Sequence, residues 1–163
     1  MKKYILNTIF PMLLVLTCGA HAAQYSGFEK IKSLVGSWQG TLPDGKPIDI
    51  SYREINGGAI VEIYHSKDPM WWNMSSVYHA GADRIIMNHY CSWGNHPRMT
   101  ARFEPAQKDR LKFRFLDMTT TASENGYMHD NTIYFEDDNH ISHHWIWREK
   151  GKDTPLVLKL ERK

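Results

Sequence analysis

The sequence predicts an all-β protein, namely an antiparallel up-and-down β-barrel of about ten strands with a short N-terminal helix capping one end. Strand-like segments follow one another from residue 34 onward, joined by short turns rich in Gly, Asp and Asn. Several segments alternate apolar and polar residues, which gives each strand one buried and one wet face. No long helical pattern interrupts them. Closure into a barrel would remove exposed strand edges, although a β-sandwich is the structural alternative.

The first residues have the three regions of a signal peptide. Met1-Lys2-Lys3 is basic, an apolar run follows from Tyr4 to Leu16, and Ala20-His21-Ala22 supplies small residues for cleavage. We therefore predict a signal peptide over residues 1–22 and a single barrel domain over 23–163. The apolar run is shorter than the roughly 20 residues that a membrane-spanning helix needs, so no transmembrane segment is expected.

The predicted location of the mature chain is periplasmic or secreted. Anchoring by a lipid on Cys18 is less favoured, because Thr17 before it is a poor match to a lipoprotein signal. Removing residues 1–22 also removes Lys2 and Lys3, which leaves basic and acidic side chains equal at 18 each. A neutral chain without a basic stripe argues against binding nucleic acid. Cys91 is then the only thiol and cannot form a disulfide within the chain.

The amphipathic stretch from Phe28 to Val35 predicts the helix, and the turns that follow it delimit the strands. Pro43-Asp44-Gly45 and Asn56-Gly57-Gly58 are examples of these turns, which join antiparallel neighbours. The expected strands are 36–43, 47–55, 59–66, 73–80, 83–91, 98–104, 110–117, 130–136, 140–148 and 155–162. Two longer connections are expected at 92–97 and 118–129.

Candidate ligand-binding residues lie on strand faces that we expect to point into the barrel. In segment 83–91, His89 and Cys91 continue an apolar row. In segment 140–148, His143 shares a face with Trp145, whereas a shift of one residue would place His144 inside instead. The predicted ligand-binding set is His89, Cys91, Met99, Phe103, Phe113, Phe115, His143 and Trp145.

The same interior offers candidate ligands for a transition metal or a haem. His89, His129 and His143 are the candidate metal ligands, and Cys91 is a further candidate. The alternative is that His89 is a hydrogen-bonded core histidine and that Cys91 is a small buried apolar residue.

An aromatic cluster at Met70-Trp71-Trp72-Asn73-Met74 is expected at one end of the barrel. It would serve either as an adaptable apolar rim for a lipid or planar ring, or as a plug that closes the barrel.

Several motifs together resemble the calycin superfamily of lipocalins, fatty-acid-binding proteins and nitrobindin-like barrels. They are Gly36-Ser37-Trp38, the run from Gly57 to Glu62, His89-Tyr90-Cys91 with the run from Gly94 to Met99, and Met128-His129. More narrowly, the chain resembles small bacterial lipocalin-like proteins of undetermined function. The resemblance implies that Trp38 packs against Arg162 as a structural pair. Nitrobindin-like barrels hold haem through a histidine near the barrel opening. The resemblance therefore implies a haem-binding histidine here, and this chain offers several candidates.

The sequence therefore predicts an exported binding protein that holds a small hydrophobic or amphipathic molecule in its barrel. One alternative is a haem- or metal-binding barrel. Another is a small enzyme with His89 as general base and Asn95 or Arg98 holding an oxyanion, although no serine-hydrolase elbow, zinc-protease motif or phosphate loop is present. A further alternative is a module that docks an envelope protein through Trp71 and Trp72. Oligomeric state is not predicted.

Overall fold

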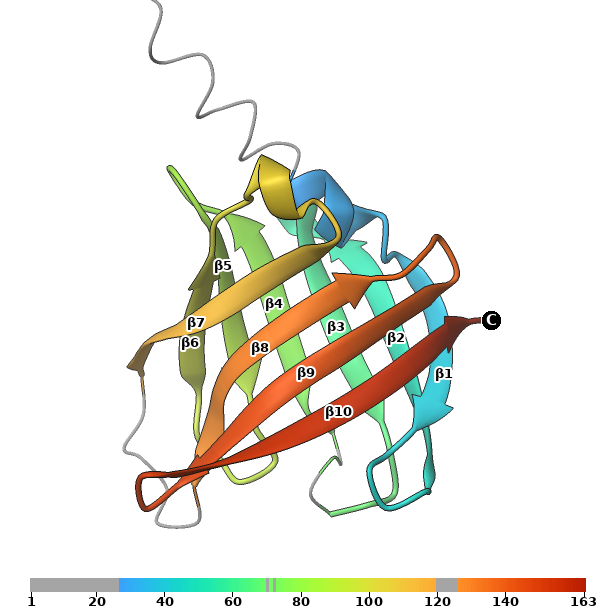
Figure 1. The fold of residues 1–163 in the computed structure, drawn as a ribbon, viewed down its shortest axis with the longest axis vertical. Coiled ribbons are helices and arrows are strands. Elements are labelled where there is room, and N and C mark those ends of the chain that lie inside the picture. Colours follow the sequence, from blue (N-terminus) through green and yellow to red (C-terminus); the bar gives the residue numbers. More distant parts are fainter. Residues whose placement is uncertain (1–26, 70, 72, 120–125) are drawn as a thin grey trace, which may run out of the picture.

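Ten antiparallel strands form one closed barrel in the computed structural model, as the sequence predicts (Figure 1). The structure describes residues 27–69, 71, 73–119 and 126–163. The strands are β1 (Gly36–Thr41), β2 (Pro47–Ile55), β3 (Ala59–His65), β4 (Ser75–Ala80), β5 (Ile85–Tyr90), β6 (Pro97–Ala101), β7 (Arg110–Met118), β8 (Tyr127–Phe135), β9 (His140–Glu149) and β10 (Lys152–Arg162). Each strand pairs with the next in sequence, and β1 pairs with β10 to close the barrel. This architecture fits a calycin-like barrel in general.

A short helix over residues 27–32 precedes β1 and lies across one end of the barrel, beside the single-turn helix η2 (Pro105–Gln107) (Figure 1). A second single turn, η1 (Asn56–Gly58), joins β2 to β3 at this end. Ile31 of this helix and Leu34 just after it are buried. Gly27 approaches Phe103 so closely that a Cβ atom on Gly27 would lie 2.6 Å from the Cβ of Phe103. The predicted cap at this end is therefore confirmed.

Two strands begin three residues earlier than the sequence predicts. β10 starts at Lys152 and runs through Pro155, which pairs with Ile146 near the end of β9. Proline lacks only its own N–H, so a strand can accommodate it near its first residues. β8 starts at Tyr127, and a register shift between Met128 and Asp130 disturbs the alternation that sequence patterns rely on.

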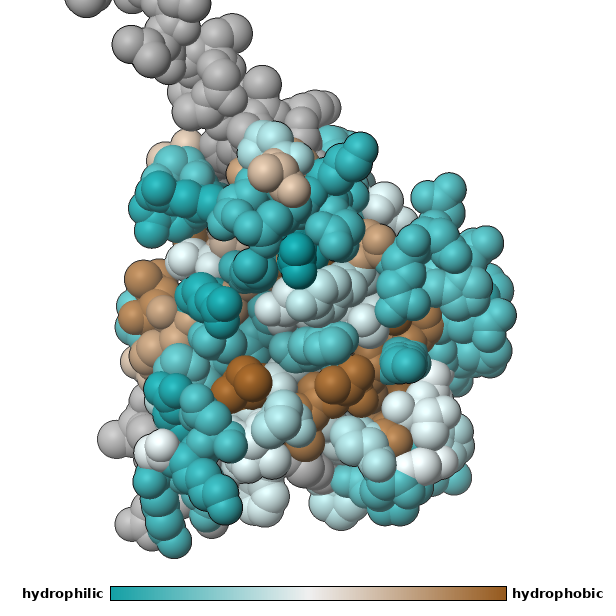
Figure 2. Space-filling model, viewed as in Figure 1, coloured by the Kyte–Doolittle hydropathy of each residue, from teal (hydrophilic) through white to brown (hydrophobic). Residues whose placement is uncertain are grey.

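Inward-facing residues of the strands form the buried core. Its largest fully buried side chains are aromatic and include Trp38, Trp145, Tyr52, Tyr64, Tyr78 and Phe113. The outer wall is mostly hydrophilic, with separate apolar patches on the face seen in Figure 2. No helix among the described residues is long and apolar enough to cross a membrane. The predicted signal peptide, including Cys18, lies outside the described residues.

Candidate functional site

A row of four polar side chains crosses the inner face of four adjacent strands. Tyr52 on β2 is in register with Glu62 on β3, Glu62 with Ser76 on β4, and Ser76 with His89 on β5. All four are buried, and Glu62 has no exposed surface. Because strand neighbours in register have adjacent side chains on one face, the pairing alone assembles this row.

Glu62 accepts hydrogen bonds from two tyrosine hydroxyl groups inside the barrel. The hydroxyl of Tyr52 donates to Oε1 at 2.6 Å, and the hydroxyl of Tyr78 donates to Oε2 at 2.7 Å. These distances fall in the range of hydrogen bonds to an ionised carboxylate. Burial, and then the Glu62 charge, raises the pKa of both tyrosines well above the usual value. Both hydroxyls therefore keep their protons and remain donors.

His143 links this pair to the opposite wall. Its Nε2 lies 2.9 Å from the Tyr52 hydroxyl, and its Nδ1 lies 3.1 Å from Nδ2 of Asn131 on β8. Burial lowers the pKa of His143 although Glu62 acts in the opposite direction, so the ring is neutral. Because Tyr52 gives its one proton to Glu62, its oxygen accepts the Nε2 proton of His143. The Nδ1 atom then accepts from Asn131, and the chain of bonds is directed toward Glu62.

His89 makes one hydrogen bond and leaves its other ring nitrogen without a partner. Its Nδ1 lies 3.0 Å from the hydroxyl oxygen of Ser76. Its ring packs against Trp145 with the centroids 5.0 Å apart. Burial lowers the pKa of His89 to about 3, so the imidazole is neutral at physiological pH. Nε2 is buried with no hydrogen-bond partner.

Four buried polar atoms in the barrel interior have no hydrogen-bond partner among the described residues. They are Nε2 of His89, the hydroxyl of Tyr64, Oδ1 of Asn131 and Nε1 of Trp145. The Tyr64 hydroxyl lies near Glu62 and Trp145 but makes no well-formed bond with either. A buried polar atom without a partner costs about 1–3 kcal/mol, so unpaired atoms rarely gather in one place without a reason.

Five of the predicted ligand-binding residues lie in this interior. His89, Met99, Phe113, His143 and Trp145 are all fully buried. Met99 is in register with Met87, and the ring of Phe113 meets that of Tyr78 edge to face with centroids 5.5 Å apart. Met99 and Phe113 supply apolar surface in the same interior as the polar row.

The other predicted binding residues lie elsewhere. Cys91 follows β5 at the end opposite the helix, where burial raises the pKa of its thiol. Phe103 is partly buried at the helix end. Phe115 is half-buried and stacks on His129 with ring centroids 4.9 Å apart. A register shift between Arg98 and Met99, where β6 pairs with β7, accompanies this departure from the core.

The three histidines proposed as metal ligands do not form one cluster. His89 and His143 are inside the core, whereas Nε2 of His129 lies 2.6 Å from Nη1 of Arg148 beside Phe115. Among the described residues, no group of three or more His, Cys, Asp or Glu side chains is placed to hold a metal ion.

Trp71 closes over the interior at the end opposite the helix. It is 3% exposed, and its ring stacks on Tyr64 with centroids 6.1 Å apart. This placement corresponds to the plug rather than the rim. Met70 and Trp72 of the same predicted cluster lie outside the described residues.

Sequence patterns did not single out Glu62 or its tyrosines as a site. In the run Ile60-Val61-Glu62-Ile63-Tyr64, alternation places Glu62 on the same strand face as Ile60 and Tyr64. A face with two large, mostly apolar side chains is an unusual position for a carboxylate. The Glu62 partners Tyr52 and Tyr78 come from two other strands, so only the pairing register reveals them.

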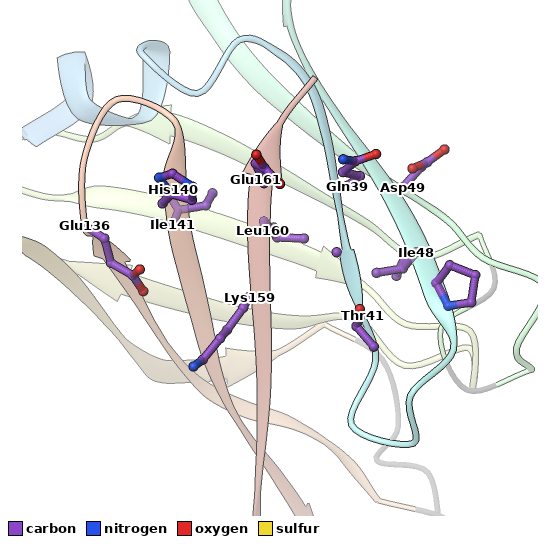
Figure 3. A pocket seen from close by; sticks show the side chains of 12 residues that line it. Gln39, Thr41, Ile48, Asp49, Glu136, His140, Ile141, Lys159, Leu160 and Glu161 are labelled. Carbon is purple, nitrogen blue, oxygen red and sulfur yellow. The ribbon is translucent and has the colours of Figure 1, made fainter.

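A groove of about 460 Å³ on the outer wall is separate from this interior (Figure 3). It lies over β1, β2, β9 and β10, and side chains of both charge signs line it, including Asp49, His140, Lys159 and Glu161. None of the polar residues in the row lines it. We take the interior rather than this open groove as the candidate site, because unpaired buried groups occur there.

Comparisons with known proteins show the fold but no family. No family model matches the chain, and no curated protein matches it. The crystal structure of Rv2717c from M. tuberculosis is similar, with a TM-score of 0.58 and 12% sequence identity over 83% of this chain and 96% of that one. A protein of unknown function from the DUF3598 family of Nostoc punctiforme has a TM-score of 0.43 and 10% identity, over 82% of this chain and 49% of that one.

Proposed function

We propose that this chain is an exported binding protein that holds one small amphipathic molecule inside the barrel, as a lipocalin-like member of the calycins would. The observation that carries the proposal is the set of four unpartnered polar atoms on His89, Tyr64, Asn131 and Trp145. A bound molecule with a polar head would supply their missing partners. Its apolar part would contact Met99 and Phe113, in the usual arrangement of apolar walls with a few orienting polar groups.

The enclosed position of the site fits a carrier better than an enzyme. With a pKa of about 3, His89 is a weak base at neutral pH. Neither group expected to hold an oxyanion lies free beside it: Asn95 donates to the Gly126 carbonyl oxygen at 2.9 Å, and Arg98 is paired with Asp117.

The interior also does not fit a haem. His89 has suitable chemistry, since its Nε2 is unpartnered and the ring is neutral. However, the ring is fully buried against Trp145, and a haem is much larger than the small amphipathic molecule that this proposal places there. We therefore assign no role to haem in this proposal. Docking of a partner through Trp71 is disfavoured in the same way, because that side chain is buried.

Native mass spectrometry of the chain from residue 23, exported to a periplasm and purified gently, tests the proposal directly. We expect an additional mass that is released on denaturation. A purified protein with no such mass is then titrated with N-phenyl-1-naphthylamine, a neutral apolar dye whose fluorescence rises in an apolar site.

Two leucine substitutions at adjacent residues of β4 test whether the dye binds inside the barrel. Ser76→Leu fills the interior beside His89, whereas Ser75→Leu changes the outer face of the same strand. We expect the first to abolish dye binding and the second to leave it unchanged. If Ser76→Leu does not fold, Ser76→Val makes a smaller change at the same position. A folded protein that carries no bound mass and takes up no dye would refute the proposed function.

A further inference from the structure

We propose that the molecule held in the barrel carries a protonated amine, and that Glu62 is the residue that binds it. This inference rests on the proposed function and names the chemical class of the ligand. Its starting point is the charge balance of the interior. Among the fully buried polar and charged side chains of the described residues, Glu62 is the only carboxylate, and neither lysine nor arginine accompanies it.

Within the part of the chain that the structure describes, His143 is the basic group near Glu62, and it does not neutralise the carboxylate. Nε2 of His143 lies 3.6 Å from Oε1 of Glu62, but burial lowers the pKa of His143 and keeps the ring neutral. The tyrosine hydroxyls stabilise the carboxylate through hydrogen bonds without cancelling its charge. A buried carboxylate without a counter-ion is costly, and a cationic ligand removes that cost.

Glu62 retains the capacity to accept further bonds. Each carboxylate oxygen has about two lone-pair sites. One hydroxyl occupies one site on each oxygen, from Tyr52 and from Tyr78. An ammonium group donates up to three hydrogen bonds, so it can use the remaining sites while the tyrosines stay in place.

Of the four unpartnered atoms, the Asn131 and Tyr64 oxygens can accept a hydrogen bond from an ammonium group, and Nε2 of His89 accepts in one of its two neutral tautomers. Oδ1 of Asn131 can only accept. The hydroxyl oxygen of Tyr64 has lone pairs available and lies near Glu62. Nε1 of Trp145 is the one atom of the four that can only donate, and the Tyr64 hydroxyl lies near it. A carboxylate or phosphate head would meet the Glu62 charge and would be repelled.

The aromatic side chains around Glu62 also favour a positively charged ligand. Tyr52, Tyr64, Tyr78 and Trp145 are all fully buried in this interior, and Trp71 covers Tyr64 from the barrel end. The negative faces of aromatic rings attract organic cations, and more strongly where water is excluded. The interior thus combines a carboxylate with aromatic walls, while the apolar residues beyond accommodate the rest of the molecule.

Three probes with the same chain and different heads test the inference. Decylamine, decanol and decanoate are compared at neutral pH below their micelle-forming concentrations, by displacement of N-phenyl-1-naphthylamine and by calorimetry. We expect decylamine to bind at least about tenfold more tightly than decanol, the factor that about 1.4 kcal/mol provides. Decanoate should bind most weakly.

Glu62→Gln removes the charge and keeps the shape. We expect this variant to bind decylamine no better than decanol, with the affinity for decanol unchanged. Glu54→Gln, which changes an exposed carboxylate on β2, should retain the wild-type preference. If Glu62→Gln does not fold, Tyr64→Phe removes a single acceptor and should reduce the preference for the amine.

The outcomes separate the two proposals. Equal affinity of the wild type for decylamine and decanol, or a preference for decanoate, overturns the amine assignment while the binding function stands. A preference for decylamine that persists in folded Glu62→Gln overturns the role of Glu62. If none of the three probes and no dye binds, the proposed binding function itself fails.

Discussion

The guanidinium group of Arg162 lies over the indole ring of Trp38, with its carbon 4.2 Å from the ring centroid. Arg162 also donates to the carbonyl oxygens of Ser33, Val35 and Asp138 at 2.8, 3.0 and 3.0 Å. One side chain of the last strand thus ties together the helical segment, the first strand and the β8–β9 turn. The pair that the calycin resemblance implies is confirmed.

Replacing Arg162 by lysine should destabilise the barrel by about 1–2 kcal/mol, because an ammonium group cannot donate to three separate carbonyls in one plane. The free energy of unfolding in urea measures this loss. Arg114→Lys is the control, since Arg114 is exposed and makes one ion pair, with Asp130. Equal stability of Arg162→Lys and wild type would show that the three carbonyls are satisfied by water.

Gly36 should not tolerate alanine. Its φ angle is 137°, and a Cβ atom there would lie 2.9 Å from Nη1 of Arg162. We expect Gly36→Ala to lower the free energy of unfolding by at least about 1 kcal/mol through strain and displacement of that guanidinium. Gly45→Ala provides the comparison, because it also has a positive φ angle but no atom within 4 Å of the added Cβ. If both variants lose a similar free energy of unfolding, backbone strain alone explains the effect.

Much of this architecture could be predicted from the sequence. All ten strands were expected near their observed positions, because turn residues and period-two alternation are local signals. The polar row was not predicted, since Tyr52, Glu62, Ser76 and His89 are neighbours only through the register of four strands. Phe115 was expected in the interior because alternation places it on the same face as Phe113. The register shift in the pairing of β6 with β7 is not visible in the sequence.

Removing one tyrosine hydroxyl from Glu62 should be costly. Tyr52→Phe and Tyr78→Phe each take away one donor from a buried carboxylate, and we expect each to destabilise the protein by about 1–3 kcal/mol. Tyr134→Phe, on the outer face of β8, should change stability little. Chemical denaturation of the three variants provides the comparison. A pair of losses no larger than that of Tyr134→Phe would mean that Glu62 does not depend on these bonds.

His89 should make stability depend on pH. Its folded pKa of about 3 lies below the value of 6.5 for an unperturbed histidine, so the unfolded chain binds the extra proton first. The contribution of neutral His89 is therefore complete above about pH 6.5 and is lost as the pH falls toward 3. Denaturation curves of wild type and His89→Gln across this range should converge as the solution becomes acidic.

The histidine control is His79→Gln, on the outer face of β4. It removes a histidine that lies outside the buried polar row. A difference between wild type and His89→Gln that stays constant over the whole acidic range would show that the buried ring does not remain neutral there.

Cys91 should be a slow-reacting thiol. It is 7% exposed, and burial raises its pKa, so little thiolate is present. In the chain from residue 23, which has no other cysteine, we expect a thiol-reactive maleimide to label the folded protein far more slowly than the protein in denaturant. Comparable labelling rates in the two states would contradict the observed burial.

Closure of the barrel sets a condition on how the chain folds. β1 pairs with β10 through Trp38–Thr41 and Lys159–Arg162, and the Arg162 contact with Val35 spans 127 residues of sequence. Contacts of such long range form slowly because a large loop must close first. Until the final strand arrives, β1 keeps an unpaired edge that another chain can extend. A polypeptide shortened by that strand would therefore be prone to join copies of itself edge to edge.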